Sequence, residues 1–179
     1  MNLPNKLTIL RIIMIPVFIA LFLYCDSNLG KILCTVVFAL ASFTDFVDGH
    51  IARKYNLVSN FGKFADPLAD KMLVTAALIC LCFSGALNPW YVIIITFREF
   101  MVTGIRILAI SDGKVIAAGT SGKIKTVIQL FAIIAMLIDR IYLLPFGLSF
   151  ILMTLAVIMT VYSGAEYLIK NINLFKNVD

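Results

Sequence analysis

Four aspartates recur at short, regular intervals within an otherwise apolar chain. They are Asp45, Asp48, Asp66 and Asp70. A carboxylate costs roughly 3 kcal/mol or more at the centre of a bilayer, so acids in such a setting persist where a cation, a partner or a wet cavity receives them. The four residues are therefore candidates for a functional site, and their number indicates bound metal ions.

The spacing predicts that these acids lie on two helical faces. Asp45 and Asp48 are three residues apart, whereas Gly62, Asp66 and Asp70 recur at every fourth residue. Residues three or four apart lie on the same face of an α-helix. We expect the loop 51–63 to hold the two helices antiparallel and adjacent, so that the four carboxylates converge on one pocket.

Oxygen ligands of this kind favour Mg²⁺, Mn²⁺ or Ca²⁺ over zinc. Two divalent ions about 3.5–4 Å apart would suit a displacement at a diphosphate, where the incoming and departing oxygens both need charge stabilisation. Gly49, Ala52 and Gly62 remove side-chain bulk where a large polar ligand would approach the backbone, and Arg53 adds a fixed positive charge. Pro67 is expected either in the first turn of its helix or at a kink.

The composition predicts an all-α integral membrane protein. Of the 179 residues, 61% are hydrophobic and 14% are charged, and the mean hydropathy is +1.01. Ordinary soluble domains carry about 25% charged residues. Apolar runs of about 20 residues mark membrane-crossing helices. Six such runs are found, at roughly 7–24, 31–50, 64–84, 89–110, 124–139 and 146–169. They leave room for one transmembrane domain over 1–179, and the first run is expected to remain as an uncleaved helix.

The positive charges predict the orientation. One side of the predicted bundle collects Lys6, Arg11, Arg53, Lys54, Lys63, Lys114, Lys123, Lys125, Lys170 and Lys176, whereas the other side has Lys31 and Arg140. Because Lys and Arg are enriched in cytoplasmic connections, both termini and the aspartate segment are expected to face the cytoplasm, around a polar cavity that opens inward. A plasma-membrane location follows as the expectation.

The spacing of the four aspartates and of the small and basic residues between them resembles the signature of the CDP-alcohol phosphatidyltransferase family. The resemblance covers eight positions, with eight residues between the fifth and the sixth: Asp45, Asp48, Gly49, Ala52, Arg53, Gly62, Asp66 and Asp70. The predicted bundle of six helices, with the motif bridging the second and third, and the chain length also suit this family.

The resemblance implies transfer of a phosphatidyl group from CDP-diacylglycerol to an alcohol, with release of CMP. It implies two divalent cations, Mg²⁺ or Mn²⁺, held by Asp45, Asp48 and Asp66 with a contribution from Asp70, and it makes Asp70 the general base. The residues it places at the cytidine diphosphate site are Asp48, Gly49, Ala52, Arg53 and Gly62, with Asn5 and Thr8 as further candidates. It also implies a homodimer.

Cations near the fourth and fifth segments point to an anionic acceptor. Arg98, Glu99 and Arg106 lie within an apolar segment, and Lys123 and Lys125 begin the next one. Together the segments FREFMVTGIR and GKIKT resemble the branch of the family whose acceptor is glycerol 3-phosphate. Arg98, Arg106, Lys123 and Lys125 are therefore expected to bind the acceptor phosphate, and Glu99 to orient an arginine.

Several alternatives remain open from the sequence. Inositol phosphate, serine or phosphatidylglycerol could be the acceptor, and Lys114, Lys123 and Lys125 could instead contact anionic lipid headgroups. Arg98 and Glu99 could form a purely structural pair. A divalent-cation transporter would use the four aspartates for permeation, and a non-catalytic scaffold would need none of them aligned. His50 and the four cysteines lack the spacing of a metal site.

Overall fold

The computed structural model describes the backbone of residues 3–54, 60–111 and 119–172, and the side chains of 5–44, 68–69, 71–110 and 119–172. Within these ranges the protein is all-helical, as the composition predicts. The elements are α1 (Leu3–Tyr24), α2 (Asn28–Lys54), α3 (Asn60–Phe83), α4 (Pro89–Ser111), α5 (Thr120–Asp139), the short 3₁₀ helix η1 (Pro145–Gly147) and α6 (Leu148–Lys170). Each of the six predicted segments corresponds to one α-helix.

Local side chains define where the helices begin and end. Ser27 Oγ accepts a hydrogen bond from the Gly30 amide at 3.1 Å, as an N-cap of α2. Asn88 Oδ1 accepts one from the Trp90 amide at 3.0 Å, and Pro89 is the first residue of α4, where a missing amide hydrogen costs nothing. Gly85 follows α3 with φ of +75°, a conformation that favours glycine and ends the helix.

The connection between α5 and α6 is held by one carboxylate. Asp139 Oδ1 accepts a hydrogen bond from the Leu144 amide at 2.7 Å, and its Oδ2 accepts one from Ser149 Oγ. Both carboxylate oxygens are thereby used to close the turn. Asp139 is thus explained by the fold of this connection.

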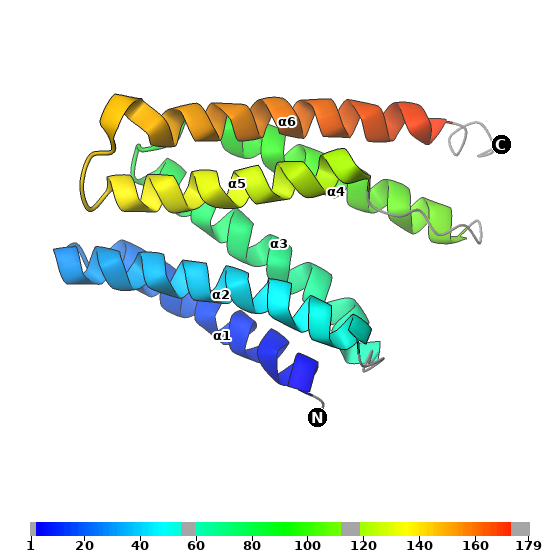
Figure 1. Cartoon of the computed structure of the whole chain (residues 1–179), viewed down its shortest axis with the longest axis horizontal. Helices are drawn as coiled ribbons and strands as arrows, with labels where there is room; N and C mark the ends of the chain where they lie inside the picture. Colours follow the sequence, from blue (N-terminus) through cyan, green and yellow to red (C-terminus); the bar gives the residue numbers. More distant parts are fainter. Residues whose placement is uncertain (1–2, 55–59, 112–118, 173–179) are drawn as a thin grey trace.

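The helices form two groups of three (Figure 1). α1, α2 and α3 pack together, α5 and α4 pack on α6, and the groups meet through contacts of α2 with α5 and of α3 with α4. A hydrophobic core joins the two groups, and its largest fully buried side chains include Phe18, Phe38, Leu78, Ile133 and Met153. Phe18 anchors the first group, with its ring centroid 5.6 Å from that of Phe38.

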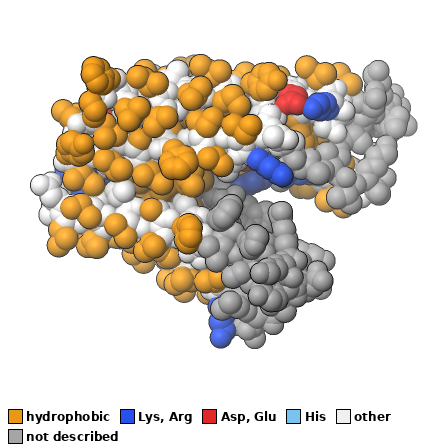
Figure 2. All heavy atoms as spheres, viewed as in Figure 1, with side chains coloured by type: hydrophobic (Ala, Val, Ile, Leu, Met, Phe, Trp, Pro, Cys, Tyr) orange, Lys and Arg blue, Asp and Glu red, His pale blue; other side chains and the backbone are white. Residues whose placement is uncertain are grey.

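The groups diverge at one end of the bundle. The last turns of α2, α4 and α6 and the first turns of α1, α3 and α5 all lie at this end (Figure 1). Figure 2 shows Lys and Arg side chains toward this end and hydrophobic side chains over most of the described part of this face. The alternating helix directions place both ends of the described chain at the same end of the bundle.

Among the described residues, three helical stretches are long and apolar enough to cross a membrane by length and composition. They are Asn5–Tyr24, Thr120–Asp139 and Pro145–Lys170. The apolar parts of α2 and α3 are shorter, at Asn28–Thr44 and Lys71–Phe83, and α4 carries three charged residues. Membrane character is therefore supported through α1, α5 and α6, and the count of six crossings stays a prediction.

Two sequence expectations about the connections are wrong. The loop expected over 51–63 is shorter, because α2 continues to Lys54 and α3 begins at Asn60. α5 likewise begins at Thr120, although the fifth apolar run was expected to begin at about residue 124. The apolar runs end where polar residues begin, but a helix satisfies its own backbone and can continue past the hydrocarbon with polar side chains.

Candidate active site

The aspartate motif occupies the ends of two neighbouring helices. Asp45 and Asp48 lie in the second half of α2, and Asp66 and Asp70 lie in the first half of α3. These parts of α2 and α3 lie together at the end of the bundle where the two groups of helices diverge (Figure 1). The predicted antiparallel pair of helices is confirmed in the backbone.

The side chains of the motif lie outside the described residues, so their convergence stays a prediction. This applies to Asp45, Asp48, Gly49, Ala52, Arg53, Gly62, Asp66 and Asp70. The expectation for Pro67 is different, because the backbone alone tells whether Pro67 lies in the first turn of its helix. α3 begins at Asn60, so Pro67 lies beyond the first turn of its helix.

Polar residues near the start of α1 are directed into the protein. Thr8 and Arg11 are fully buried, and Asn5, Thr8 and Arg11 all take part in polar or electrostatic contacts. A guanidinium that serves only as a membrane-surface anchor would lie in the headgroup region. Burial of Arg11 shows that its side chain is part of the protein interior, whereas sequence reasoning had assigned Arg11 only to the positive side of the bundle.

Three of the predicted acceptor-site residues meet around one carboxylate oxygen. Glu99 Oε1 lies 3.0 Å from Arg98 Nη1 and 2.5 Å from Lys125 Nζ. Arg98 and Glu99 come from α4, whereas Lys125 comes from α5. The side chains are 11% exposed for Arg98, 25% for Glu99 and 2% for Lys125. We call these three residues the cation cluster.

Burial sets Lys125 apart from an ordinary positive-inside lysine. A lysine that contacts lipid headgroups keeps its ammonium group in water or at the interface. Lys125 instead buries its ammonium group against Glu99. Arg98 is similarly enclosed, so the structure places both cations inside the helix bundle.

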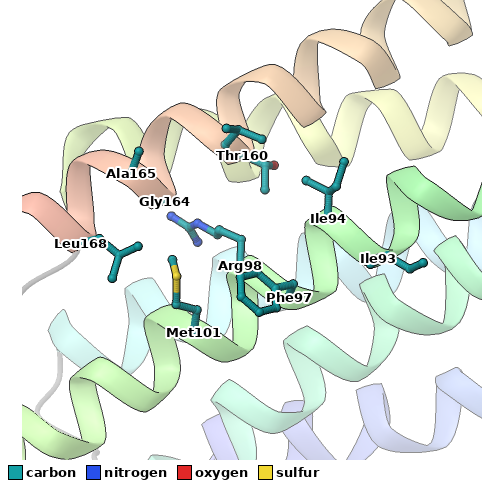
Figure 3. A pocket seen from close by; sticks show the side chains of 10 residues that line it. Ile93, Ile94, Phe97, Arg98, Met101, Thr160, Gly164, Ala165 and Leu168 are labelled. Atoms are coloured by element: carbon teal, nitrogen blue, oxygen red, sulfur yellow. The ribbon is translucent and has the colours of Figure 1, made fainter.

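Two glycines make room for Arg98 between α4, α5 and α6. A Cβ atom added at Gly164 would lie 3.0 Å from Arg98 Cγ, and one added at Gly122 would lie 3.3 Å from Arg98 Nη2. Arg98 Nη2 also donates a hydrogen bond to Ser163 Oγ at 3.1 Å. Figure 3 shows the guanidinium extending from α4 toward α6 beside Gly164.

The other two predicted acceptor residues lie apart from the cation cluster. Arg106 is two turns from Glu99 along α4, where its Nε donates to Tyr167 Oη at 3.4 Å and its guanidinium lies 5.7 Å from the Tyr167 ring centroid. Lys123 has an exposed side chain at the start of α5. The structure therefore groups Arg98 with Lys125 and leaves Arg106 and Lys123 nearer the open end.

A lysine that sequence reasoning missed connects α3 to α4. Lys71 Nζ donates a hydrogen bond to Thr103 Oγ1, and Thr103 Oγ1 in turn donates to the Glu99 carbonyl at 2.7 Å. Lys71 directly follows Asp70. The turn of α3 that carries Asp70 and Lys71 therefore lies against the turn of α4 that carries Thr103. Thr103 is one turn from Glu99 of the cation cluster.

The cavity beside Arg98 is an apolar groove between α4 and α6 (Figure 3). It measures about 320 Å³, and Arg98 is its only charged lining residue. Its other lining residues are Ile93, Ile94, Phe97, Met101, Thr160, Val161, Gly164, Ala165 and Leu168. Phe97 and Val161 are exposed, as expected for a surface covered by lipid. The predicted polar cavity would be lined by the motif residues. Their side chains lie outside the described residues, so this cavity stays a prediction.

Comparison with known proteins decides the family. A family model described as CDP-alcohol phosphatidyltransferase matches residues 1–162. The chain belongs to the CDP-alcohol phosphatidyltransferase family. The resemblance of the aspartate motif is thus confirmed at the level of the family.

Relatives in this family share most of the chain length. The protein is 44% identical to one from Bacillus subtilis (strain 168) named CDP-diacylglycerol–glycerol-3-phosphate 3-phosphatidyltransferase, over 95% of each chain. It is 41% identical to one of the same name from Rickettsia bellii (strain RML369-C), over 93% of each chain. A protein of Mycobacterium tuberculosis (strain ATCC 25618 / H37Rv) named "Probable phosphatidylglycerophosphate synthase" is 36% identical over 94% of this chain and 81% of its own.

The carboxylates of the aspartate motif are ligands that suit a hard divalent cation. Four carboxylates supply only oxygen ligands, which Mg²⁺ and Mn²⁺ prefer, and the backbone brings the two helices that carry them to one end of the bundle. Among the side chains that the structure describes, no group of three or more His, Cys, Asp and Glu could hold a metal. Binding of such cations by the motif stays a prediction, since the motif side chains lie outside the described residues.

Proposed function

We propose that this CDP-alcohol phosphatidyltransferase transfers the phosphatidyl group of CDP-diacylglycerol to glycerol 3-phosphate. The products are phosphatidylglycerophosphate and CMP, which makes the protein an enzyme of phospholipid biosynthesis. The observation that carries the choice of acceptor is the buried pairing of Arg98 and Lys125 around Glu99. Relatives named for this reaction match nearly the whole chain.

Asp45, Asp48 and Asp66, with a contribution from Asp70, would hold two divalent cations, Mg²⁺ or Mn²⁺. When bound, such ions stabilise negative charge on the diphosphate oxygens. Gly49, Ala52, Arg53 and Gly62 would line the cytidine diphosphate site beside Asp48. Asn5 and Thr8 are further candidates there, and the burial of Thr8 at the same end of the bundle supports its inclusion.

Asp70 would act as the general base. It accepts the proton of the acceptor hydroxyl while that oxygen attacks the phosphorus that carries diacylglycerol. A new P–O bond forms to the acceptor, the bond to the bridging oxygen breaks, and CMP leaves with the bonding electrons. The contact between Lys71 and Thr103 supports this role, because it brings the Asp70 turn of α3 close to the cation cluster.

Arg98 and Lys125 would bind the acceptor phosphate, and Arg106 and Lys123 would line the approach from the open end. A phosphate group forms strong charge-assisted hydrogen bonds with guanidinium and ammonium groups. Serine offers a carboxylate but no phosphate, so the buried cations favour a phosphorylated acceptor. The acceptor would be held by its phosphate while its free hydroxyl reaches Asp70.

The protein would cross the plasma membrane six times as a homodimer, with both termini and the active site in the cytoplasm. The arrangement of helix ends supports this topology, since the motif, the cation cluster and both ends of the described chain share one end of the bundle. The excess of Lys and Arg at the same end supports the cytoplasmic assignment.

A panel of acceptors tests the proposed function. The purified protein with Mg²⁺ or Mn²⁺ and CDP-diacylglycerol is given glycerol 3-phosphate, inositol 1-phosphate, serine or phosphatidylglycerol in turn, and CMP release is measured. We expect release with glycerol 3-phosphate at least tenfold above each of the others. Preference for another acceptor would contradict the assignment of the substrate, and metal flux into proteoliposomes without CDP-diacylglycerol would instead support a transporter.

A further inference from the structure

One oxygen atom of Glu99 joins two cations from different helices. Oε1 accepts from Arg98 Nη1 at 3.0 Å and from Lys125 Nζ at 2.5 Å. Two like charges that share one oxygen repel each other strongly in a partly buried setting. The carboxylate lowers this repulsion, so the geometry of both cations depends on it.

The guanidinium of Arg98 is fixed from two directions and still has donors left. Nη1 is bound to Glu99 and Nη2 to Ser163, so neither end of the planar group can turn freely. Its Nε is buried and has no hydrogen-bond partner among the residues that the structure describes. A guanidinium carries five N–H donors, and the arrangement therefore leaves capacity for an anionic ligand.

Charge balance also favours an anionic ligand at the cluster. Arg98 and Lys125 contribute two positive charges and Glu99 contributes one negative charge, so the three residues retain a net positive charge. A carboxylate that binds both cations cannot neutralise both. Phosphate, with two negative charges and several acceptor oxygens, complements this arrangement.

We propose that Glu99 is a positioning residue of the acceptor site. It holds Arg98 and Lys125 at the spacing that binds the acceptor phosphate, without itself touching the reacting atoms. This inference rests on the proposed function and adds a residue to it. A competing role for the same contact has the opposite consequence: a carboxylate that merely occupies the cations would have to be displaced by the phosphate.

The two roles predict opposite changes of the KM for glycerol 3-phosphate when Glu99 loses its charge. Glu99→Gln keeps an oxygen acceptor and removes the charge, and charge-assisted hydrogen bonds are about twice as strong as neutral ones. We expect the KM for glycerol 3-phosphate to rise about tenfold, with the KM for CDP-diacylglycerol changed by less than about twofold. Glu99→Asp, which keeps the charge on a shorter side chain, is expected to recover part of the loss.

Glu166→Gln is the matched control. Glu166 also pairs with a lysine at 2.5 Å, Lys170 on the same helix, but that lysine is largely exposed and lies outside the cation cluster. The control substitution removes the same charge near the same end of the bundle. Its KM for glycerol 3-phosphate is expected to match the unmodified protein within about twofold.

Three outcomes would overturn the proposal. The first is a lower KM for glycerol 3-phosphate in Glu99→Gln, which would show that Glu99 competes with the acceptor. The second is an equal rise in both KM values, and the third is loss of CDP-diacylglycerol binding in both Glu99 variants; each would show a general structural role. If the unmodified protein prefers another alcohol, the proposed function fails, whereas the KM for that alcohol still tests Glu99.

Discussion

Asp70 and Lys71 show how neighbouring residues on α3 connect the two halves of the site. Lys71 reaches Thr103 of α4, and Thr103 lies one turn from Glu99. Among the motif aspartates, Asp70 is the one next to this contact. The role of Asp70 at the acceptor hydroxyl stays a proposal, because its side chain lies outside the described residues.

Asp70→Asn should retain nucleotide binding and lose turnover. The amide has nearly the same shape but cannot accept the proton, and general base catalysis contributes about 10²–10⁴-fold to rate. We expect kcat for CMP release to fall at least about 100-fold. Binding of a CDP-lipid, measured by titration calorimetry, should be retained. Asp26→Asn, at an exposed residue of the α1–α2 connection, is the control, and normal turnover of Asp70→Asn would remove Asp70 from its role.

At the residue scale, the sequence was informative where charges stand out against an apolar background. Arg98 and Lys125 were predicted to bind one acceptor phosphate, with Glu99 orienting an arginine, and the structure brings the three residues into contact. Ser163 was missed because a serine is unremarkable in such a helix. Its importance comes from contact with Arg98 across 65 residues of sequence separation, which no local pattern reveals.

At the element scale, the six helices followed from the length of the apolar runs, but their ends did not. α2 and α3 each extend past the predicted limits with polar and small residues, since hydropathy marks the hydrocarbon boundary and not the end of a helix. The packing of α6 against α4 was also hidden from the sequence. It depends on Gly164, whose missing side chain leaves space for Arg98.

Gly164→Ala tests this packing of α4 against α6. The added Cβ would lie 3.0 Å from Arg98 Cγ, so the Arg98 side chain has to shift by a few tenths of an ångström. A side chain moved off its rotamer costs about 0.5–1.5 kcal/mol. We expect the KM for glycerol 3-phosphate to rise roughly three- to tenfold, measured by CMP release. Helix propensity alone would favour alanine, so reduced acceptor binding cannot be ascribed to a weaker helix.

Gly104→Ala is the matched control on α4. A Cβ atom at Gly104 would meet nothing within 4 Å, and alanine is favoured over glycine in a helix by about 1 kcal/mol. Activity should stay within about twofold of the unmodified protein, with equal or higher thermal stability. An unchanged acceptor KM in Gly164→Ala would show that Arg98 is not held by the close approach of α6.

At the scale of the whole molecule, the bundle combines a closed end with an open one. The hydrophobic core joins both groups of helices, and their ends diverge where the motif lies (Figure 1). Apolar length predicts such a bundle of helices. It does not predict which helices pack together, because the exposed apolar surface of a membrane protein resembles its core in composition.

The proposed orientation of the molecule predicts the behaviour of fusion reporters. Alkaline phosphatase is active outside the cytoplasm, whereas green fluorescent protein matures in it. With the open end in the cytoplasm, phosphatase fused after Asn88, at the opposite end of the bundle, should be active, and phosphatase fused after Lys170 should be inactive. Fluorescent protein should give the reverse pattern, and exchange of the two patterns would contradict the cytoplasmic location of the site.

Transfer of an intact acceptor into lipid is the most direct test of the central claim. Deuterated glycerol 3-phosphate and CDP-diacylglycerol of defined acyl chains are incubated with the purified protein and Mg²⁺ or Mn²⁺, and the organic phase is analysed by mass spectrometry. The account predicts phosphatidylglycerophosphate that carries the full label, with one CMP released per lipid formed. CMP release without labelled lipid would show hydrolysis of the donor, and it would contradict the account.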